Sequence, residues 1–214
     1  MQERHDEFPP VYRYLSREYI EEFFSSGKLR LSAFGEFAKH ADEQRRDMQE
    51  GWLIVTIPIP GKQLELRSRA GIGRDTYILS ASLRGDMELM RVFHTDGYFK
   101  INNVAAFSTA VASKITDCTG ILVGSCKYAG HKEIRREMGE IAEKAVEKSP
   151  QGKMYIDQVA RLIGRALFPY ALFLKQGGYA HQQEFRFIWQ VSHEVHEPLF
   201  VECPEAVQFC ERIT

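Results

Sequence analysis

The chain has 214 residues, of which 44% are hydrophobic and 27% are charged, and its formal net charge is -1. This length and apolar content allow one substantial core, so we expect a single domain over residues 1–214. A net charge near zero provides no overall positive field, which argues against binding to nucleic acids or membrane surfaces through bulk charge.

The sequence gives no sign of a membrane anchor or a metal site. Its first ten residues, MQERHDEFPP, are charged, and no run approaches the roughly 20 apolar residues of a membrane helix. We therefore expect a cytoplasmic protein with no membrane partner. His193 and His196 lack the i, i+4 spacing of a zinc-binding helical pair, so we expect no metal. The cysteines form no C-x-x-C pair, which argues against a disulfide framework.

Strand and helix patterns of apolar residues divide the first half of the chain into short elements. In chain order they predict a strand over 11–15, a helix over 17–26, a strand over 28–32, helix-compatible residues 34–50, and strands over 52–60, 64–67 and 76–82. Ser16 can cap the first helix and Gly27 can end it. Pro58 and Pro60 donate no ladder hydrogen bond, so they confine their strand to a sheet edge or to a strand end.

The second half of the chain mixes helices and strands. In chain order it predicts a helix from Asp86 through residue 95, a strand over 98–102, a helix over 104–115, a buried strand over 121–128, helices over 131–149 and 155–168, and strands over 172–175, 184–191 and 198–201. The helix over 131–149 is amphipathic, and its alternating acids and bases are typical of a solvated face. Together the two halves predict an α+β fold.

A glycine-rich turn leads into a polar strand start in KQGGYAHQQEFRFIW, residues 175–189. Gly177 and Gly178 form the turn. In the strand that follows, alternation places Gln182, Glu184 and Arg186 in one row, with mainly apolar residues on the other face. One face of this strand can therefore pack, while the other presents an amide, a carboxylate and a guanidinium.

This segment resembles the catalytic segment of mono-ADP-ribosyltransferases, in which a mobile turn with an aromatic residue precedes a strand carrying (Gln/Glu)-x-Glu. The other two signatures of that family follow in the same order: an arginine on the first strand, here Arg13 in VYRYLS, and a Ser-x-Ser, here Ser80 and Ser82 in DTYILSAS. Ala81 stands where the family has threonine. The resemblance implies two roughly perpendicular, mainly antiparallel sheets, flanked by helices, that enclose a cleft for NAD as the substrate.

The sequence is also similar to a bacterial family of unknown function with a Lys-Tyr start and a Glu-x-Glu-Tyr-Arg strand. The matching segments are YRYLS, GKLRLS, ILSAS and EFRFIW. The usual Phe-Asn-Asp-Pro segment of that family is replaced by GEFAKHADEQRRDMQEG, so no role of that segment can be transferred. This second resemblance indicates an order of elements but no reaction.

The first resemblance implies a role for each residue of the candidate site. Glu184 would stabilise the positive charge that develops on the ribose when the bond to nicotinamide breaks, and Gln182 would orient the incoming nucleophile. Arg13 would bind the pyrophosphate of NAD. The remaining candidates are Ser80 and Ser82 for the nicotinamide half of NAD, Tyr12, Tyr14 and Tyr98 for packing on nicotinamide, and Tyr179 and Arg186 for the substrate acceptor.

Several alternatives stay open at the level of sequence. The acceptor is a macromolecule, either nucleic acid or protein, and such transferases act as toxins or in defence against phage, in some cases with an antitoxin or chaperone. An NAD glycohydrolase would use the same glutamate with water, and a non-catalytic module would only bind a nucleotide or partner. In purely structural terms, Arg13 can pair with a surface acid, Ser80 and Ser82 can face solvent, and Glu184 can pair with Arg186 at a sheet edge.

Overall fold

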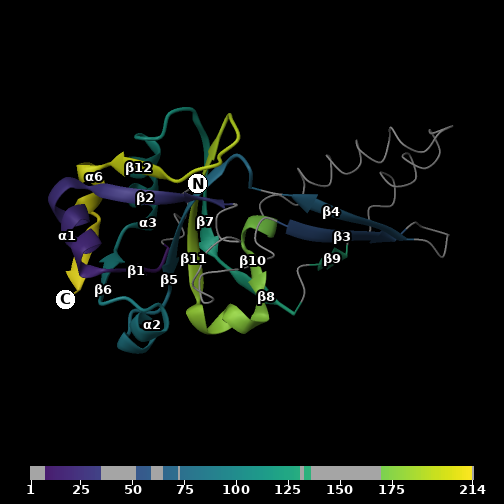
Figure 1. Ribbon diagram of the computed structural model, residues 1–214, viewed down its shortest axis with the longest axis horizontal. Coiled ribbons are helices and arrows are strands. Elements are labelled where there is room, and N and C mark those ends of the chain that lie inside the picture. Colours follow the sequence, from purple (N-terminus) through teal and green to yellow (C-terminus); the bar gives the residue numbers. More distant parts are fainter. Residues whose placement is uncertain are drawn as a thin grey trace, which may run out of the picture.

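The computed structural model describes residues 8–34, 52–58, 65–71, 73–130, 133–135 and 170–213 (Figure 1). Its strands are β1 Val11–Leu15, β2 Lys28–Ala33, β3 Trp52–Pro58, β4 Glu65–Gly71, β5 Thr76–Ser82, β6 Gly97–Ile101, β7 Cys118–Ser125, β8 Lys127–Ala129, β9 Glu133–Arg135, β10 Leu174–Gln176, β11 Glu184–Val191, β12 Leu199–Glu202 and β13 Cys210–Ile213. Its helices are α1 Arg17–Ser26, α2 Met87–Val92, α3 Val104–Ala112, α6 Pro204–Val207 and the 3-10 helix η2 Gly177–Gln182. The predicted α+β class is confirmed.

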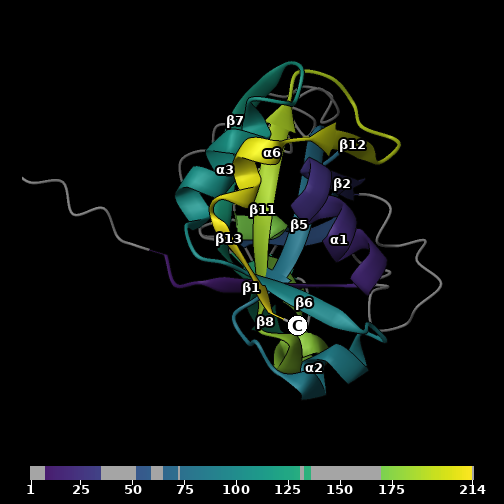
Figure 2. The ribbon, with the colours of Figure 1, turned by 90° about the vertical axis from the view of Figure 1, so that its left-hand side faces the viewer.

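The main structural unit is an eight-stranded sheet in which the order β12-β2-β5-β1-β6-β13 is extended by β11 and β7. Its pairings are all antiparallel in the part of the chain that the structure describes. β5 lies at the branch point, because it pairs with β11 along its full length and with both β2 and β1 over shorter stretches. Figure 2 shows β5 and β11 side by side through the middle of the body.

Alternation along β11 builds the core on one face of this sheet. Phe185, Phe187 and Trp189 are buried, and the rings of Phe187 and Trp189 stack at 6.1 Å. Phe107 of α3 packs edge-on against Phe187 at 5.2 Å, and the indole nitrogen of Trp189 donates to the carbonyl of Ser108 at 3.0 Å. These rings exclude water and bury a large apolar area, which is the main stabilising contribution in a protein core.

Helix α1 is fixed by its end and by its apolar face. Its C-cap, Gly27, has a φ of 74° and donates its N–H to the carbonyl of Phe23 at 2.7 Å. A Cβ at this position would lie 2.2 Å from the nitrogen of Pro204, so only glycine fits between α1 and the segment before α6. The ring of Phe23 then stacks on Phe99 of β6 at 4.8 Å, which attaches the helix to the sheet.

Two smaller sheets complete the described structure. β3 lies between antiparallel β4 and parallel β9, and β10 pairs in parallel with β8. β3 is therefore an interior strand, so the predicted edge position was wrong, whereas the alternative position of Pro58 at a strand end is confirmed. In the described part of the chain, no helix has the length and apolar character needed to cross a membrane.

Several predicted elements differ from those in the structure. The predicted helix over 131–149 begins instead as strand β9, because this segment pairs with β3. The predicted buried strand over 121–128 is two strands, β7 and β8, and β7 is half exposed, since it packs mainly through its inner face. The strand predicted over 172–175 is present as β10 but begins two residues later, because Leu172 still belongs to a helical turn; the C-terminal α6 and β13 were not anticipated. The helix-compatible range 34–50, apart from Phe34, and the predicted helix over 155–168 lie outside the described residues.

Candidate functional site

The three motif-bearing strands are direct neighbours in the sheet, in the order β1-β5-β11. Ser82 lies opposite both Tyr12 and Glu184 in the strand register. The hydroxyl of Ser80 donates to Glu184 Oε1 at 2.9 Å, and the guanidinium of Arg13 donates to the main-chain carbonyl of Ser80 at 2.5 Å. Ser80 and Glu184 therefore meet through their side chains, whereas Arg13, which lies opposite the core residue Phe99 in the register, reaches the main chain of Ser80.

Arg13 reaches that carbonyl because β5 lacks a continuous partner on this edge. β5 contacts β2 through Tyr77 and Ile78 and contacts β1 only through Ser82, so the Ser80 carbonyl lies between the two pairing points. A buried main-chain carbonyl needs a hydrogen-bond donor, and Arg13 Nη1 provides it. The arginine thus bridges β1 and β5 through the main chain of Ser80.

Glu184 is buried and ionised. Its side chain is 7% exposed, and Arg186 Nε donates to Oε1 at 2.7 Å while the ammonium of Lys175 donates to Oε2. Burial raises the pKa of a carboxyl group, but here the positive charges of Arg186 and Lys175 outweigh it and hold the pKa of Glu184 well below its ordinary value. The predicted Glu184–Arg186 ion pair exists, although β11 is an interior strand and not a sheet edge.

The hydrogen bonds to Glu184 leave part of its carboxylate available. An ionised carboxylate has about four lone-pair positions. Ser80 and Arg186 take two positions on Oε1, and Lys175 takes one on Oε2. Among the described residues, the remaining acceptor position is therefore on Oε2. A hydroxyl group of a ligand could use it.

Gln182 does not lie on β11, so its predicted place in a strand row with Glu184 was wrong. It ends the 3-10 helix η2, and the next residue, Gln183, has a φ of 43°, which breaks the strand alternation. Gln182 still comes close to Glu184, because Lys175 Nζ donates to Gln182 Oε1 at 2.8 Å as well as to the carboxylate. The Gln182 residue is only 2% exposed.

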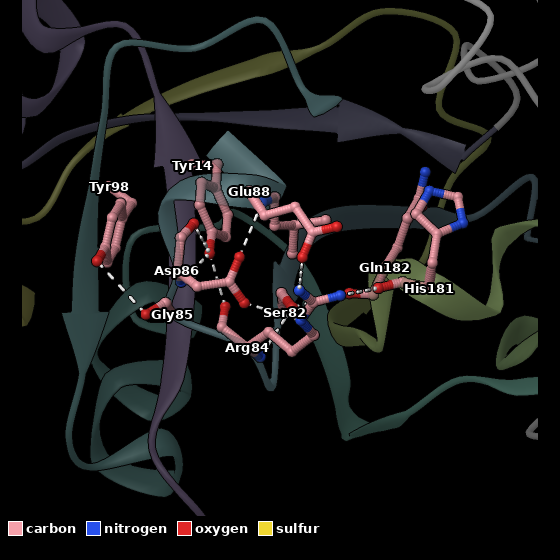
Figure 3. Close-up of polar contacts among 10 residues, drawn as sticks. Tyr14, Ser82, Arg84, Gly85, Asp86, Glu88, Tyr98, His181 and Gln182 are labelled. Carbon is pink, nitrogen blue, oxygen red and sulfur yellow. Dashed lines mark hydrogen bonds and ion pairs between the residues drawn. The ribbon is translucent and has the colours of Figure 1, made fainter. Parts of the chain in front are cut away.

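Ser82 anchors the exit of η2. Its hydroxyl donates to the carbonyl of Gln182 at 2.7 Å and accepts from the N–H of Arg84 at 2.9 Å (Figure 3). The N–H of Leu83 also donates to the carbonyl of Gln183 at 2.9 Å. Ser80 and Ser82 therefore act differently, because the first contacts the carboxylate and the second holds the turn that precedes it.

Arg84 joins the same turn to helix α2. Its guanidinium donates to the carboxylates of Asp86 and Glu88 at 2.8 and 2.9 Å and to the carbonyl of His181 at 3.1 Å (Figure 3). Asp86 also accepts from the N–H of Leu89 and so caps α2. The ends of β5, α2 and η2 are thereby connected through one arginine side chain.

The predicted nicotinamide-packing tyrosines form a cluster beneath this loop. The rings of Tyr14 and Tyr98 lie 5.0 Å apart, and those of Tyr12 and Tyr98 lie 6.1 Å apart. The Tyr14 hydroxyl donates to the carbonyl of Arg84 at 2.8 Å and accepts from the N–H of Asp86 at 2.9 Å (Figure 3). A Cβ at Gly85 would lie 2.3 Å from the Tyr12 ring. In this structure the tyrosines position the loop after β5.

Tyr179 and Arg186 differ in how far a ligand could reach them. Tyr179 is half-buried on η2, with the ammonium of Lys175 4.8 Å from its ring centre. Arg186 is 2% exposed in its side chain, donates to the carbonyl of Leu172 and lies with its guanidinium 5.6 Å from the ring centre of Phe34. Arg186 can therefore influence a ligand through Glu184, whereas Tyr179 lies on the outer turn.

Sequence reasoning missed Lys175 and Tyr128 as members of the site. The two residues lie opposite each other in the parallel pairing of β10 with β8. The Tyr128 hydroxyl accepts from the main-chain N–H of Glu184 at 2.7 Å, and burial raises the pKa of this phenol. The available signal was a lysine two residues before the glycine turn, close enough along the chain for its side chain to reach Gln182 and Glu184.

Comparison with known proteins places this chain in no family. The family models that were searched include no match to the chain. No curated protein and no solved structure matches it either. A search of the described residues for clusters of histidine, cysteine, aspartate and glutamate that could hold a metal ion also finds none.

Proposed function

We propose that this protein cleaves the bond between nicotinamide and ribose in NAD and transfers ADP-ribose to a macromolecular acceptor. One observation carries the proposal: the three motifs lie on adjacent strands, with the Ser80 hydroxyl bonded to Glu184 and Arg13 bonded to the main-chain carbonyl of Ser80. The resemblance in sequence to mono-ADP-ribosyltransferases requires such a meeting, which is unexpected for three unrelated polar residues.

The proposed reaction uses the charge of Glu184. The bond between ribose C1′ and the nicotinamide nitrogen breaks, its electron pair stays with nicotinamide, and positive charge develops on the ribose. An ionised carboxylate beside C1′ stabilises this charge more in the transition state than in the ground state. An acceptor atom then bonds to C1′ and loses its proton to water. The low pKa of Glu184 ensures that the carboxylate is ionised near neutral pH.

Ser80 and the remaining acceptor position on Oε2 suggest how the ribose is oriented. Ser80 and Arg186 fix Oε1, so the carboxylate cannot rotate freely. The ribose 2′-hydroxyl can donate to Oε2, where Lys175 is the neighbouring donor. Because the ribose cation and the ammonium repel each other, we expect Lys175 to shift toward Gln182 as NAD enters.

An NAD glycohydrolase is the second candidate, and burial favours it. The Glu184 side chain is 7% exposed and Gln182 is 2% exposed, so less room is needed beside the carboxylate for water than for a large acceptor. Both activities release nicotinamide, but only the transferase attaches ADP-ribose to a macromolecule. The two candidates are therefore separated by where the ADP-ribose goes.

The test incubates the purified protein with NAD labelled in its ADP-ribose half, with and without a cell lysate as the source of acceptors. We expect nicotinamide release and labelled macromolecules, which nuclease and protease digestion then assign to nucleic acid or protein. Free ADP-ribose without macromolecular label would identify a hydrolase. Absence of nicotinamide release in both reactions would reject both enzymes in favour of a binding module.

Glu184→Gln tests the proposed catalytic carboxylate, with a matched control. Loss of this charge also leaves Lys175 and Arg186 buried without their partner, so the variant is assayed well below its own melting temperature. The control is Glu205→Gln, which breaks a 2.8 Å ion pair with Lys114 on the surface. We expect Glu184→Gln to abolish activity while folded and Glu205→Gln to retain it.

A further inference from the structure

Lys175 connects the turn η2 to the candidate catalytic carboxylate. Its side chain is 8% exposed, and its ammonium donates to both Gln182 Oε1, at 2.8 Å, and Glu184 Oε2. The same ammonium lies 4.8 Å from the ring centre of Tyr179. An ammonium has three donors and no acceptor, so these contacts match its bonding capacity and offset the cost of burying it. The lysine is thus built into the site.

The position of Lys175 makes it a clamp across the turn. It lies on β10 immediately before η2, and its partners Gln182 and Glu184 lie at the end of η2 and just after it. Ser82 and Leu83 hold only the exit of the turn. At the entrance, a Cβ at Gly178 would meet nothing within 4 Å. The Arg84 guanidinium also contacts the His181 carbonyl within the turn, and Lys175 is the restraint that connects the turn to Glu184.

We propose that Lys175 is a positioning residue that directs ADP-ribose to the acceptor in preference to water. The inference rests on the proposed function, in which Glu184 cleaves NAD while the half-buried Tyr179 contacts the acceptor and the buried Gln182 orients it from below. By holding Gln182 and Tyr179 beside Glu184, Lys175 keeps the acceptor groups in reach of the ribose carbon as it becomes reactive. Small errors of position reduce such a reaction strongly.

The test compares Lys175→Met, Lys175→Arg and Gln182→Met with the wild type. Lys175→Met keeps the length of the side chain and removes the charge, and Gln182→Met removes the acceptor of the Lys175–Gln182 hydrogen bond while leaving the Lys175–Glu184 pair. The control is Lys114→Met, which removes a surface ion pair with Glu205. Each protein is incubated with labelled NAD and cell lysate, and the ratio of macromolecular label to free ADP-ribose is measured.

We expect this transfer-to-hydrolysis ratio to fall at least tenfold in Lys175→Met and in Gln182→Met, to fall less in Lys175→Arg, and to stay unchanged in Lys114→Met. In the double variant that combines Lys175→Met with Gln182→Met, the ratio should fall no further than in the more affected single variant, because both changes remove the same hydrogen bond. A lysine that only stabilises the fold would lower transfer and hydrolysis together and leave the ratio unchanged. That result would overturn the proposal.

Amide hydrogen exchange of the wild type, Lys175→Met and Lys175→Arg gives a readout that needs no activity. We expect faster exchange in residues 177–183 of Lys175→Met, with unchanged exchange in β5 and in the rest of β11. Unchanged exchange in the turn would reject the clamp even if NAD is cleaved. If instead the wild type releases no nicotinamide, the proposed function fails, and exchange alone decides whether Lys175 holds the turn.

Discussion

Ser80 and Glu184 are separated by 104 residues and share a hydrogen bond of 2.9 Å, from the serine hydroxyl to Oε1 of the carboxylate. The bond crosses from β5 to β11, which are adjacent and antiparallel. Arg186 donates to the same oxygen, so Ser80 and Arg186 together fix the plane of the carboxylate. The orientation of Glu184 therefore depends on a residue from the middle of the chain.

Ser80→Ala is expected to lower the rate of NAD cleavage about ten- to a hundredfold, since hydrogen bonds to charged groups contribute about 1.5–3 kcal/mol. Nicotinamide release at saturating NAD measures the effect. Ser82→Ala is the comparison, because the Ser82 hydroxyl contacts main-chain groups and not the carboxylate. It should lower stability and loosen η2 more than it slows cleavage. Equal rate losses in the two variants would contradict the division of roles between these serines.

Acid should destabilise the protein partly through Glu184. The pKa of this group in the folded protein lies below its ordinary value of about 4.5, so the unfolded chain binds the proton first as the pH falls. Its contribution to stability is complete above pH 4.5 and decreases below that pH. Glu184→Gln should lose about 3–5 kcal/mol at pH 7 and show a flatter decrease in acid. Urea unfolding at pH 7 and pH 3.5 measures both; parallel pH profiles would rule out this contribution.

Alkaline pH should destabilise the protein through Tyr14. Burial raises the pKa of this phenol to about 12, so the unfolded chain releases its proton first. The stabilising contribution is present below pH 10, decreases between pH 10 and 12, and is absent above pH 12. Ultraviolet titration of the tyrosines should show a late-titrating group that is missing in Tyr14→Phe. A titration curve identical in shape for the two proteins would contradict the assignment.

Gly27→Ala should destabilise the fold by about 2 kcal/mol or more, because the positive φ disfavours any side chain and the new Cβ would meet Pro204. Gly130→Ala is the matched control, since a Cβ there has no neighbour within 4 Å. Thermal unfolding of both variants provides the comparison. Similar melting temperatures for the two would show that the segment before α6 moves aside easily.

The sequence predicted much of the central sheet because alternation and end signals agree there. The strands β1, β2, β5 and β11 and the helix α1 follow the predicted ranges closely. Gly27 ends α1 as expected, whereas Ser16 precedes the helix but its side chain makes no capping hydrogen bond. The family resemblance also led us to expect Arg13, Ser80 and Glu184 in one site; their strands are adjacent, and Ser80 contacts Glu184. Whether these residues act on NAD remains a prediction.

The contacts that complete the site depend on local geometry that alternation does not encode. Gln183 adopts a positive φ, so counting back from Glu184 placed Gln182 on a strand that does not include it. Lys175 can reach Gln182 because η2 curves and brings the end of the turn back to β10. The segment that contains β9 was predicted as a helix because its charged residues follow an amphipathic pattern. Its pairing with β3 is a contact between distant segments, which this local pattern does not reveal.

The placement of hydroxyls and aromatic rings on opposite faces of β5 and β11 has a consequence for length changes in these strands. Deleting or inserting a single amino acid in β5 would reverse its parity, sending Leu79 and Ala81 toward Glu184 and the hydroxyls into the aromatic interior. Because β5 is held on both sides, its neighbours resist sliding to compensate. Insertions and deletions here should therefore be far less tolerated than conservative replacements. The alternation of side chains along this strand pair determines which groups lie beside Glu184.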